Sequence, residues 1–128
     1  NFGFERARSI SPAGFALQTG IVFTFHQDAP VIEPNVLETV QCAVTRTTKS
    51  GVVLGEEERI SALDALRAVT INAAYQYSEQ ELKGSIKAGK HADFVILSDN
   101  PLTVPCDAIS GIDVVETIKD GRSLFRLS

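Results

Sequence analysis

Methionine and tryptophan are absent from the sequence, and its 128 residues include only two cysteines and two histidines. A chain without methionine carries no initiator residue, so we expect a processed product or a piece of a longer protein. No apolar run approaches the roughly 18 residues that span a membrane, and the first residues lack the charged and apolar segments of a signal peptide. We therefore expect a soluble, cytoplasmic chain with no membrane partner.

The two cysteines, Cys42 and Cys106, lie far apart in the sequence and match no metal-ligand spacing. Free cysteines are often buried, and structural disulfides are rare in cytosolic proteins. We expect two reduced, partly buried thiols, the alternative being one structural disulfide between them.

Composition and charge narrow the class of protein further. Apolar residues make up 44% of the chain and charged residues 22%, which is typical of a folded globular domain. The formal net charge is −4, and the excess of acidic residues lies in the second part of the chain. Because phosphate contacts need a basic face, we expect no nucleic-acid partner.

The start of the chain predicts a short helix followed by a strand. Ser11 stands before a proline, which suits an N-cap, and Gly20 suits a C-terminal stop, so a helix is predicted over Pro12–Thr19. The residues of Ile21–Phe25 are β-branched or aromatic on both faces. Such a run is typical of a strand that is covered on both sides in a parallel sheet or barrel.

Capping residues predict further helices in the middle of the chain. Asn35 precedes apolar residues at helical spacing and is expected to cap a helix. Ser61 and Asp64 resemble a capping box that opens a helix over Ala62–Val69. Thr70 is expected to cap one or two more turns.

After residue 84 the pattern changes to strands. One strand is predicted over Asp93–Leu97, and a β-hairpin over Val114–Lys119 and Arg122–Leu127. The Asp120-Gly121 pair between the hairpin strands suits the positive φ angles of a two-residue type I′ turn. Helices followed by three strands indicate an α/β unit joined to a small β unit.

Asp28 is the one candidate for chemistry that emerges from the residues alone. It follows the predicted strand Ile21–Phe25, and parallel barrels place their active-site residues just beyond the C-terminal ends of strands. The alternative is an Asx-turn, in which the Asp28 carboxylate accepts local amide protons ahead of Pro30.

Three other polar or turn-forming features are interpreted as structural. His91 is expected to be a solvated histidine in a turn, and Glu56–Glu58 a solvated acidic run before a helix. The glycines at 84, 89 and 121 punctuate turns, because no phosphate-binding glycine pattern surrounds them.

Several blocks that follow one another along the chain resemble the C-terminal part of the amidohydrolase superfamily, and more narrowly amidohydrolase family 3. They are Val22–Val31, Ala43–Arg46, Val53–Gly55, Ile60–Ala74 and Gly84–Leu97. The order and spacing of these blocks are more specific than any one of them.

The resemblance implies a fold. Members of this family have a (β/α)8 TIM barrel, with a metal site at the C-terminal ends of its strands, flanked by a small β-sandwich assembled from both ends of the chain. Residues 1–83 would supply the last strand and helices of the barrel, and residues 84–128 the C-terminal strands of the sandwich. Exposed strand edges recruit other chains, so we expect a homo-oligomer or strand-exchanged dimer besides contacts with the N-terminal remainder of the same protein.

The resemblance also implies a site. Asp28 would ligate a divalent metal, usually zinc, and would accept a proton from the attacking water as general base. His26 would either face the small-molecule substrate or support the residues around it, the alternative being a hydrogen bond to a loop carbonyl. The family's remaining ligands, a His-x-His pair among them, have no counterpart here, and catalytic zinc normally has three protein ligands. Zinc is therefore expected in the full-length protein and not on this chain alone.

Two hypotheses of function follow. In the first, the chain is the C-terminal part of a metal-dependent hydrolase that cleaves a non-peptide carbon–nitrogen bond in an amide, cyclic imide or amine, and the chain is inactive by itself. In the second, the parent protein keeps the scaffold but works as a binding or regulatory protein, since fold does not determine function.

Overall fold

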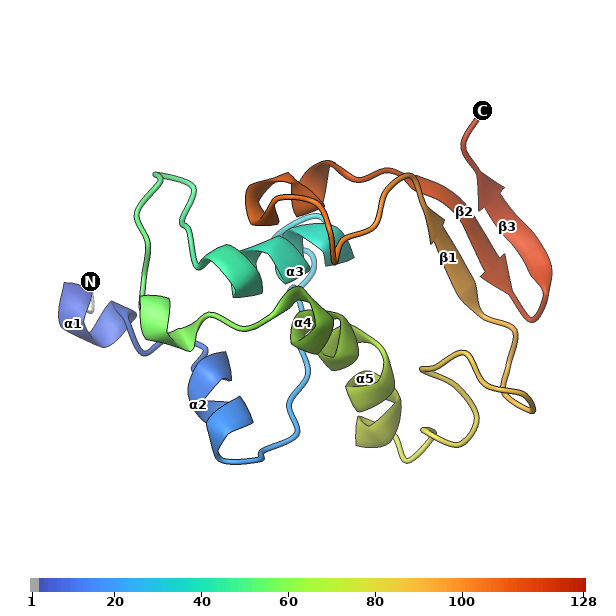
Figure 1. Cartoon of the computed structure of the whole chain (residues 1–128), viewed down its shortest axis with the longest axis horizontal. Coiled ribbons are helices and arrows are strands. Elements are labelled where there is room, and N and C mark those ends of the chain that lie inside the picture. Colours follow the sequence, from blue (N-terminus) through green and yellow to red (C-terminus); the bar gives the residue numbers. More distant parts are fainter. Residues whose placement is uncertain (1–2) are drawn as a thin grey trace.

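The computed structural model describes residues 3–128 as five short helices, two 3₁₀ turns and three strands (Figure 1). Their bounds, in chain order, are α1 Phe4–Ala7, α2 Ala13–Gln18, α3 Val36–Thr45, η1 Glu56–Glu58, α4 Ala62–Val69, α5 Ile71–Gln76, β1 Phe94–Leu97, η2 Cys106–Gly111, β2 Val114–Lys119 and β3 Arg122–Arg126. The helices occupy one end of the molecule and the sheet the other. Within the described residues, no helix is long and apolar enough to cross a membrane.

Two of the predicted helix caps are confirmed. The Asn35 side chain accepts a hydrogen bond from the Glu38 amide at 3.1 Å, and the Ser61 hydroxyl accepts one from the Asp64 amide at 3.1 Å. Thr70 is the N-cap residue of α5, as predicted, but its hydroxyl makes no capping hydrogen bond, because it donates to the Leu66 carbonyl at 2.7 Å instead. Helix α5 nevertheless follows directly.

Helix α2 begins differently from the prediction. Ser11 has a positive φ of 51° and lies outside the helix, so the expected side-chain cap does not form. The cap comes from η1 instead, because the Glu58 carboxylate accepts the amide proton of Phe15 at 2.8 Å. Gly14 permits this approach, since a Cβ there would lie 2.7 Å from the Glu57 carbonyl oxygen.

Ile21–Phe25 is not a strand, which corrects the prediction. Residues 21–28 form no β-ladder with any described segment, and a strand needs a neighbour to take its backbone hydrogen bonds. Side chains of α5 hold the segment instead. The Asn72 amide donates to the Phe23 carbonyl at 3.0 Å, and the Thr24 hydroxyl donates to the Gln76 side chain at 2.9 Å.

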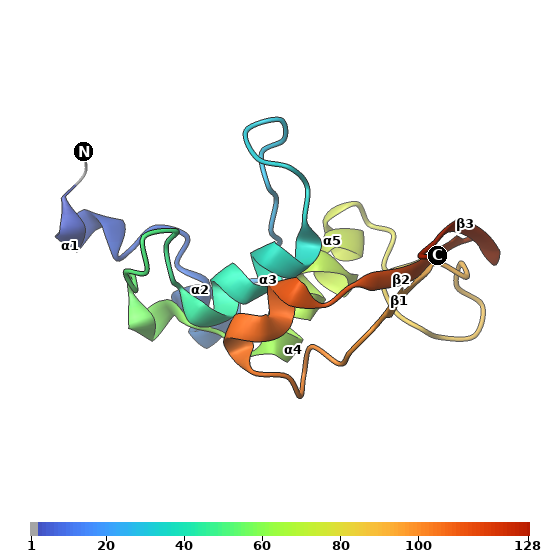
Figure 2. The same cartoon turned by 90° about the horizontal axis from the view of Figure 1, so that it is seen from above.

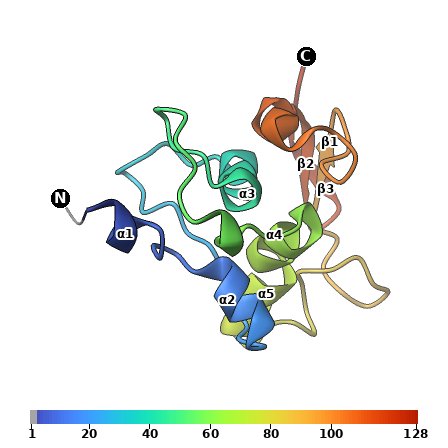
Figure 3. The ribbon, with the colours of Figure 1, turned by 60° about the vertical axis from the view of Figure 1, so that its left-hand side comes forward.

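The apolar core lies between the helices and is completed by a segment from near the C-terminus. Figure 3 shows α3 on one side of α4, with α2 and α5 on the other. Val40 of α3, Ala65 of α4 and Ile109 of η2 are fully buried in one cluster. The Ser110 amide also donates to the Gln41 side chain on α3 at 2.8 Å. The division at residue 83 stays a prediction, and residues from both sides of it share this core.

The sheet confirms the predicted hairpin. Its three strands are antiparallel in the order β1-β2-β3, and Asp120 and Gly121 have φ angles of 49° and 76°, as a type I′ turn requires. Every residue of β3 is exposed. Because β2 lies between the other two strands, β1 and β3 are free edges of the sheet within the described chain.

Candidate functional site

Asp28 lies in a loop that projects from the helices before α3 begins (Figure 2). Its backbone has a positive φ of 54°, and its carbonyl accepts the Val31 amide proton at 2.9 Å. No hydrogen bond reaches its carboxylate from the residues that the structure describes. The main chain rather than the side chain closes this turn, so the Asx-turn alternative is not formed and the carboxylate of Asp28 is exposed.

His26 is bonded to the backbone of Asp28. The Asp28 amide donates to His26 Nδ1 at 3.2 Å, so the ring accepts an amide proton instead of donating to a loop carbonyl. This arrangement leaves Nε2 as the donor of the neutral ring. The contact ties the ring of His26 to the position of Asp28, and the role of both residues in catalysis stays a prediction.

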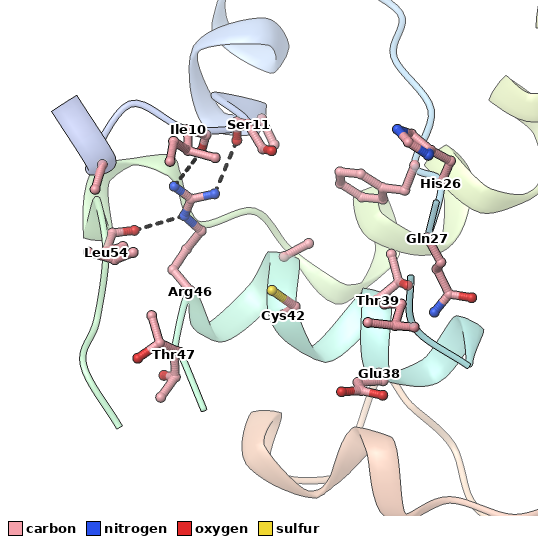
Figure 4. A pocket seen from close by; sticks show the side chains of 16 residues that line it. Ile10, Ser11, His26, Gln27, Glu38, Thr39, Cys42, Arg46, Thr47 and Leu54 are labelled. Atoms are coloured by element: carbon pink, nitrogen blue, oxygen red, sulfur yellow. Dashed lines mark hydrogen bonds between the residues drawn. The ribbon is translucent and has the colours of Figure 1, made fainter. Parts of the chain in front are cut away.

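A cavity of about 370 Å³ opens beside this loop (Figure 4). His26 and Gln27 form one wall, and Thr39 and Cys42 reach it from α3. Ile10 belongs to the opposite wall, which residues between α1 and α2 contribute. The Gln27 amide is held by the Asn35 carbonyl, so this wall is attached to the start of α3.

Arg46 shapes the opposite wall of the cavity. It follows α3 with a positive φ of 56°, and its guanidinium donates to four backbone carbonyls. The acceptors and distances are Leu54 at 2.9 Å, Ser11 at 3.1 Å, Arg8 at 3.3 Å and Ile10 at 2.7 Å. One side chain therefore holds three segments together, and sequence patterns do not show partners this far apart in the chain.

Gly55 completes this arrangement. Its φ is 61°, and a Cβ at this position would lie 2.2 Å from the Arg8 carbonyl oxygen. Only glycine combines that backbone conformation with so close an approach. The loop after α3 can therefore pack directly against the segment before α2.

Within the acidic run Glu56–Glu58, the first two residues are exposed, as expected, and all three carboxylates also make contacts that the sequence did not indicate. Glu57 pairs with Arg8 at 3.0 Å and Glu56 with Arg59 at 2.5 Å, while Glu58 caps α2. A hydrogen bond from its own backbone, and after it the Arg8 guanidinium, hold the pKa of Glu57 below its usual range. Glu57 and Glu58 thus fasten η1 to the N-terminal segment, whereas the Glu56–Arg59 pair is local.

A polar cluster joins the turn after residue 89 to the hairpin. His91 is half exposed, as expected, but its Nδ1 lies 2.9 Å from an Asp120 carboxylate oxygen. Asp93 accepts from the Asp120 amide at 2.9 Å and pairs with Lys119 at 2.8 Å. The Lys119 ammonium, followed by the Asp120 amide, holds the pKa of Asp93 below its usual range. The cluster organises the turn and lies at the sheet, whereas Asp28 lies in the loop before α3.

The cysteines and the histidines do not assemble a metal centre. Cys42 and Cys106 are free, as predicted, but both are exposed and not partly buried. Within residues 3–128, no group of three His, Cys, Asp or Glu side chains could hold a metal ion. Since catalytic zinc normally has three protein ligands, the described residues alone do not fit a zinc site, and Asp28 could contribute one ligand at most.

Comparisons with known proteins give consistent matches over this chain. The model of a family described as "Amidohydrolase family" matches residues 1–125. The N-substituted formamide deformylase of Arthrobacter pascens is 31% identical over 110 residues, which are 86% of this chain and 20% of the relative. The imidazolonepropionase of Phocaeicola vulgatus is 40% identical over 68 residues, 52% of this chain and 16% of the relative.

Two further matches cover most of the chain. The protein LONG AFTER FAR-RED 3 of Arabidopsis thaliana is 36% identical over 125 residues, 96% of this chain and 21% of the relative. A solved structure, the amidohydrolase from Thermotoga maritima MSB8, superposes with a TM-score of 0.63 at 27% identity, covering 87% of this chain and 24% of that one. The chain thus spans about a fifth of the length of the curated relatives that it matches over most of its length.

Proposed function

The chain belongs to the amidohydrolase family, and from this premise we propose that it forms the C-terminal part of a hydrolase of non-peptide carbon–nitrogen bonds. Two of the relatives described above are named as a formamide deformylase and an imidazolonepropionase. Their names support a substrate in which the cleaved bond belongs to an amide or to a cyclic imide-like group. In this proposal the described helices pack against a TIM barrel whose strands lie outside the described residues.

Asp28 is the residue that this chain contributes to the chemistry. Its carboxylate is exposed and receives no hydrogen bond from the described residues, so its lone pairs are available. A carboxylate in this state can accept the proton of a water molecule that attacks the substrate carbon and can pass it to the leaving nitrogen. This free carboxylate, in a chain of this family, is the observation that supports the proposal best.

The metal and the rest of the site come from elsewhere in the protein in this proposal. A divalent ion, with zinc as the expected metal, would lower the pKa of a bound water and polarise the substrate carbonyl. Its remaining ligands would belong to residues outside this chain, with Asp28 as the one ligand from it. We therefore expect the isolated chain to bind no stoichiometric zinc and to hydrolyse nothing.

Substitution of Asp28 in the intact protein tests the proposal. Asp28→Ala and Asp28→Asn should each lower kcat/KM by about 100-fold or more, because general acid–base catalysis supplies about that much. Glu33→Gln is the matched control, since Glu33 is an exposed carboxylate in the same loop. A fully active Asp28→Ala enzyme would refute the assignment.

Metal analysis of the intact protein separates this function from the alternative. A hydrolase of this kind should contain at least one divalent ion for each chain and should lose its turnover when a chelator removes the ion. A folded protein with no metal and no turnover would instead be a binding or regulatory protein that retains the scaffold.

A further inference from the structure

Asp28 has an uncommon backbone conformation. Its φ of 54° lies in the left-handed region, which costs free energy in a residue other than glycine and persists where neighbouring contacts hold it. The rotamers open to a side chain depend on its backbone angles, so this conformation limits the directions in which the Asp28 carboxylate can point. Whatever holds the backbone of Asp28 therefore also positions the proposed general base.

Two hydrogen bonds hold this backbone, one at the carbonyl and one at the amide. The Asp28 carbonyl accepts the Val31 amide proton at 2.9 Å, and the Asp28 amide donates to His26 Nδ1 at 3.2 Å. The first bond joins two main-chain groups, whereas the second depends on the side chain at position 26. A substitution there removes one of the two restraints and leaves the other in place.

The bond from His26 has the pattern of an Asx-turn that begins two residues before Asp28. In such a turn a side-chain acceptor takes the amide proton of the residue two positions further on. His26 Nδ1 does the same for Asp28. Asparagine at position 26 would supply an equivalent acceptor, because its side-chain oxygen is the usual one in this turn, whereas leucine would supply none.

The segment that carries His26 is itself attached to a helix. The neighbouring Gln27 is partly buried, and its amide donates to the carbonyl of Asn35, the cap of α3. Figure 4 shows His26 and Gln27 following each other on one wall. Within the described chain, the bond to the Asp28 amide is the one hydrogen bond that the His26 ring makes. The ring thus links a segment attached to α3 with the backbone of Asp28.

Resting on the function proposed above, we infer that His26 is a positioning residue, which holds the backbone of Asp28 through Nδ1 and so keeps its carboxylate in the orientation that catalysis needs. Of the two roles that the family resemblance leaves open for His26, this is the supporting one. His26 then acts through Asp28, and contact of its Nε2 with the substrate is not required.

Substitutions at position 26 of the intact protein separate the two roles. The probe substrate is N-methylformamide, a member of the class for which one relative is named. His26→Leu removes both ring nitrogens and should lower kcat about 10-fold or more with little change in KM, because displacing a reacting group by about 1 Å can cost about 100-fold. His26→Asn keeps the acceptor but has no counterpart of Nε2, so it should restore kcat to within about threefold of the unaltered protein.

The matched control is His91→Leu. It makes the same change at the other histidine, which is half exposed and lies beside the hairpin turn. It should leave kcat within about twofold of the unaltered protein, as surface substitutions away from a site usually have small effects. Far-ultraviolet circular dichroism checks the fold of each variant.

A double-mutant cycle shows whether His26 acts through Asp28. If it does, His26→Leu should lower kcat by less than about twofold in an Asp28→Asn background, because residues that act as one unit are not additive. Equal fold-losses in both backgrounds would show that His26 acts by itself, and would overturn the inference.

Nuclear magnetic resonance tests the contact without turnover. A scalar coupling between the Asp28 amide nitrogen and His26 Nδ1 is transmitted only through the hydrogen bond that joins them. We expect this coupling in the isotope-labelled intact protein. Its presence or absence in the unaltered protein is informative even where His26→Leu does not fold.

Each outcome decides the inference. The coupling, together with a higher kcat for His26→Asn than for His26→Leu, supports it. A missing coupling, or an asparagine variant as impaired as the leucine variant, overturns it. A fully active Asp28→Asn protein would overturn the proposed function, whereas Asp28-dependent turnover that His26→Leu leaves intact would overturn only the role of His26.

Discussion

The helical region, from α2 to α5, and the sheet of β1 to β3 are stabilised by different means. Val40 and Ala65 of the helices are fully buried, together with Ile109 of η2, whereas every residue of β3 is exposed. The sheet depends on its backbone ladder and on polar contacts such as the Arg126–Glu116 pair at 3.0 Å. Burial thus holds the helical region together, while the sheet keeps much of its surface available for other parts of a protein.

Removing a buried side chain should show the largest difference between the two regions. Ile109→Ala should lower the free energy of unfolding by about 3 kcal/mol, because it leaves a cavity in the shared core. Leu124→Ala in β3 should cost less than about 0.5 kcal/mol, because that side chain is 69% exposed. Urea unfolding of both variants checks the contrast, and equal losses would contradict it.

The exposed strand edges should promote association, whereas the helical region should not. Phe125 is 48% exposed on the edge strand β3, and a charge on such an edge opposes pairing with another chain. If a dimer forms through this edge, Phe125→Lys should raise its dissociation constant about tenfold, which is about 1.4 kcal/mol. Light scattering against concentration measures this, with Tyr77→Lys, at a 71% exposed residue beyond α5, as the control. A wild-type chain that remains monomeric would refute the prediction.

Removing a helix cap should lower the free energy of unfolding less than removing a buried side chain. The loss should also differ between two positions within the helical region. Ser61→Ala removes the hydroxyl that accepts the Asp64 amide proton, and should lower the free energy of unfolding by about 1 kcal/mol. Thr70→Ala should cost less than about 0.5 kcal/mol, because the exposed Thr70 hydroxyl caps no helix start. Thermal unfolding of the pair tests this, and a larger loss at position 70 would be the contrary result.

Acid should loosen the sheet before it affects the core of the helices. The Ser123 hydroxyl, followed by Arg126, holds the pKa of Glu116 below its usual 4.5, and Lys119 holds that of Asp93 below 3.8. A carboxyl with a lowered pKa in the folded state stabilises the fold above its ordinary pKa, and that contribution is lost as the pH falls through the folded value.

Hydrogen exchange of backbone amides across this pH range measures the effect. Once the intrinsic pH dependence of exchange is corrected for, protection of β2 and β3 should fall below the ordinary carboxyl pKa while that of α3 is kept. Glu116→Gln should flatten the profile of the sheet. Loss of protection in both regions at the same pH would show that they do not differ in this respect.

Local features could be predicted from the sequence because their partners lie a few residues away. The side chains of Asn35 and Ser61 cap their helices by accepting amide protons from residues three positions further along. The Asp120-Gly121 turn needs only its own backbone angles. Ile21–Phe25 could not be judged this way, because a strand also depends on its neighbours. Its composition predicts a segment covered on both sides, but Ile21 and Val22 are exposed, whereas Phe23 and Phe25 pack against the core.

In the candidate site, too, local features could be predicted from the sequence and long-range contacts could not. Asp28 could be singled out from its position after an apolar run, and its backbone turn keeps the carboxylate free. The cavity beside it could not be predicted, because its walls come from segments that are separated along the chain. Arg46 has the same character, since its guanidinium bonds carbonyls at positions 8, 10, 11 and 54. A sequence pattern records none of these long-range contacts.

The cap of α2 sets an order of events during synthesis of the chain. Phe15 takes its capping carboxylate from Glu58, which is 43 residues further along the chain. A six-residue helix is too short to persist by itself in water. We therefore expect residues 13–18 to form a stable helix only after η1 has been synthesised and has docked. Helix α2 is early in the sequence and late in folding.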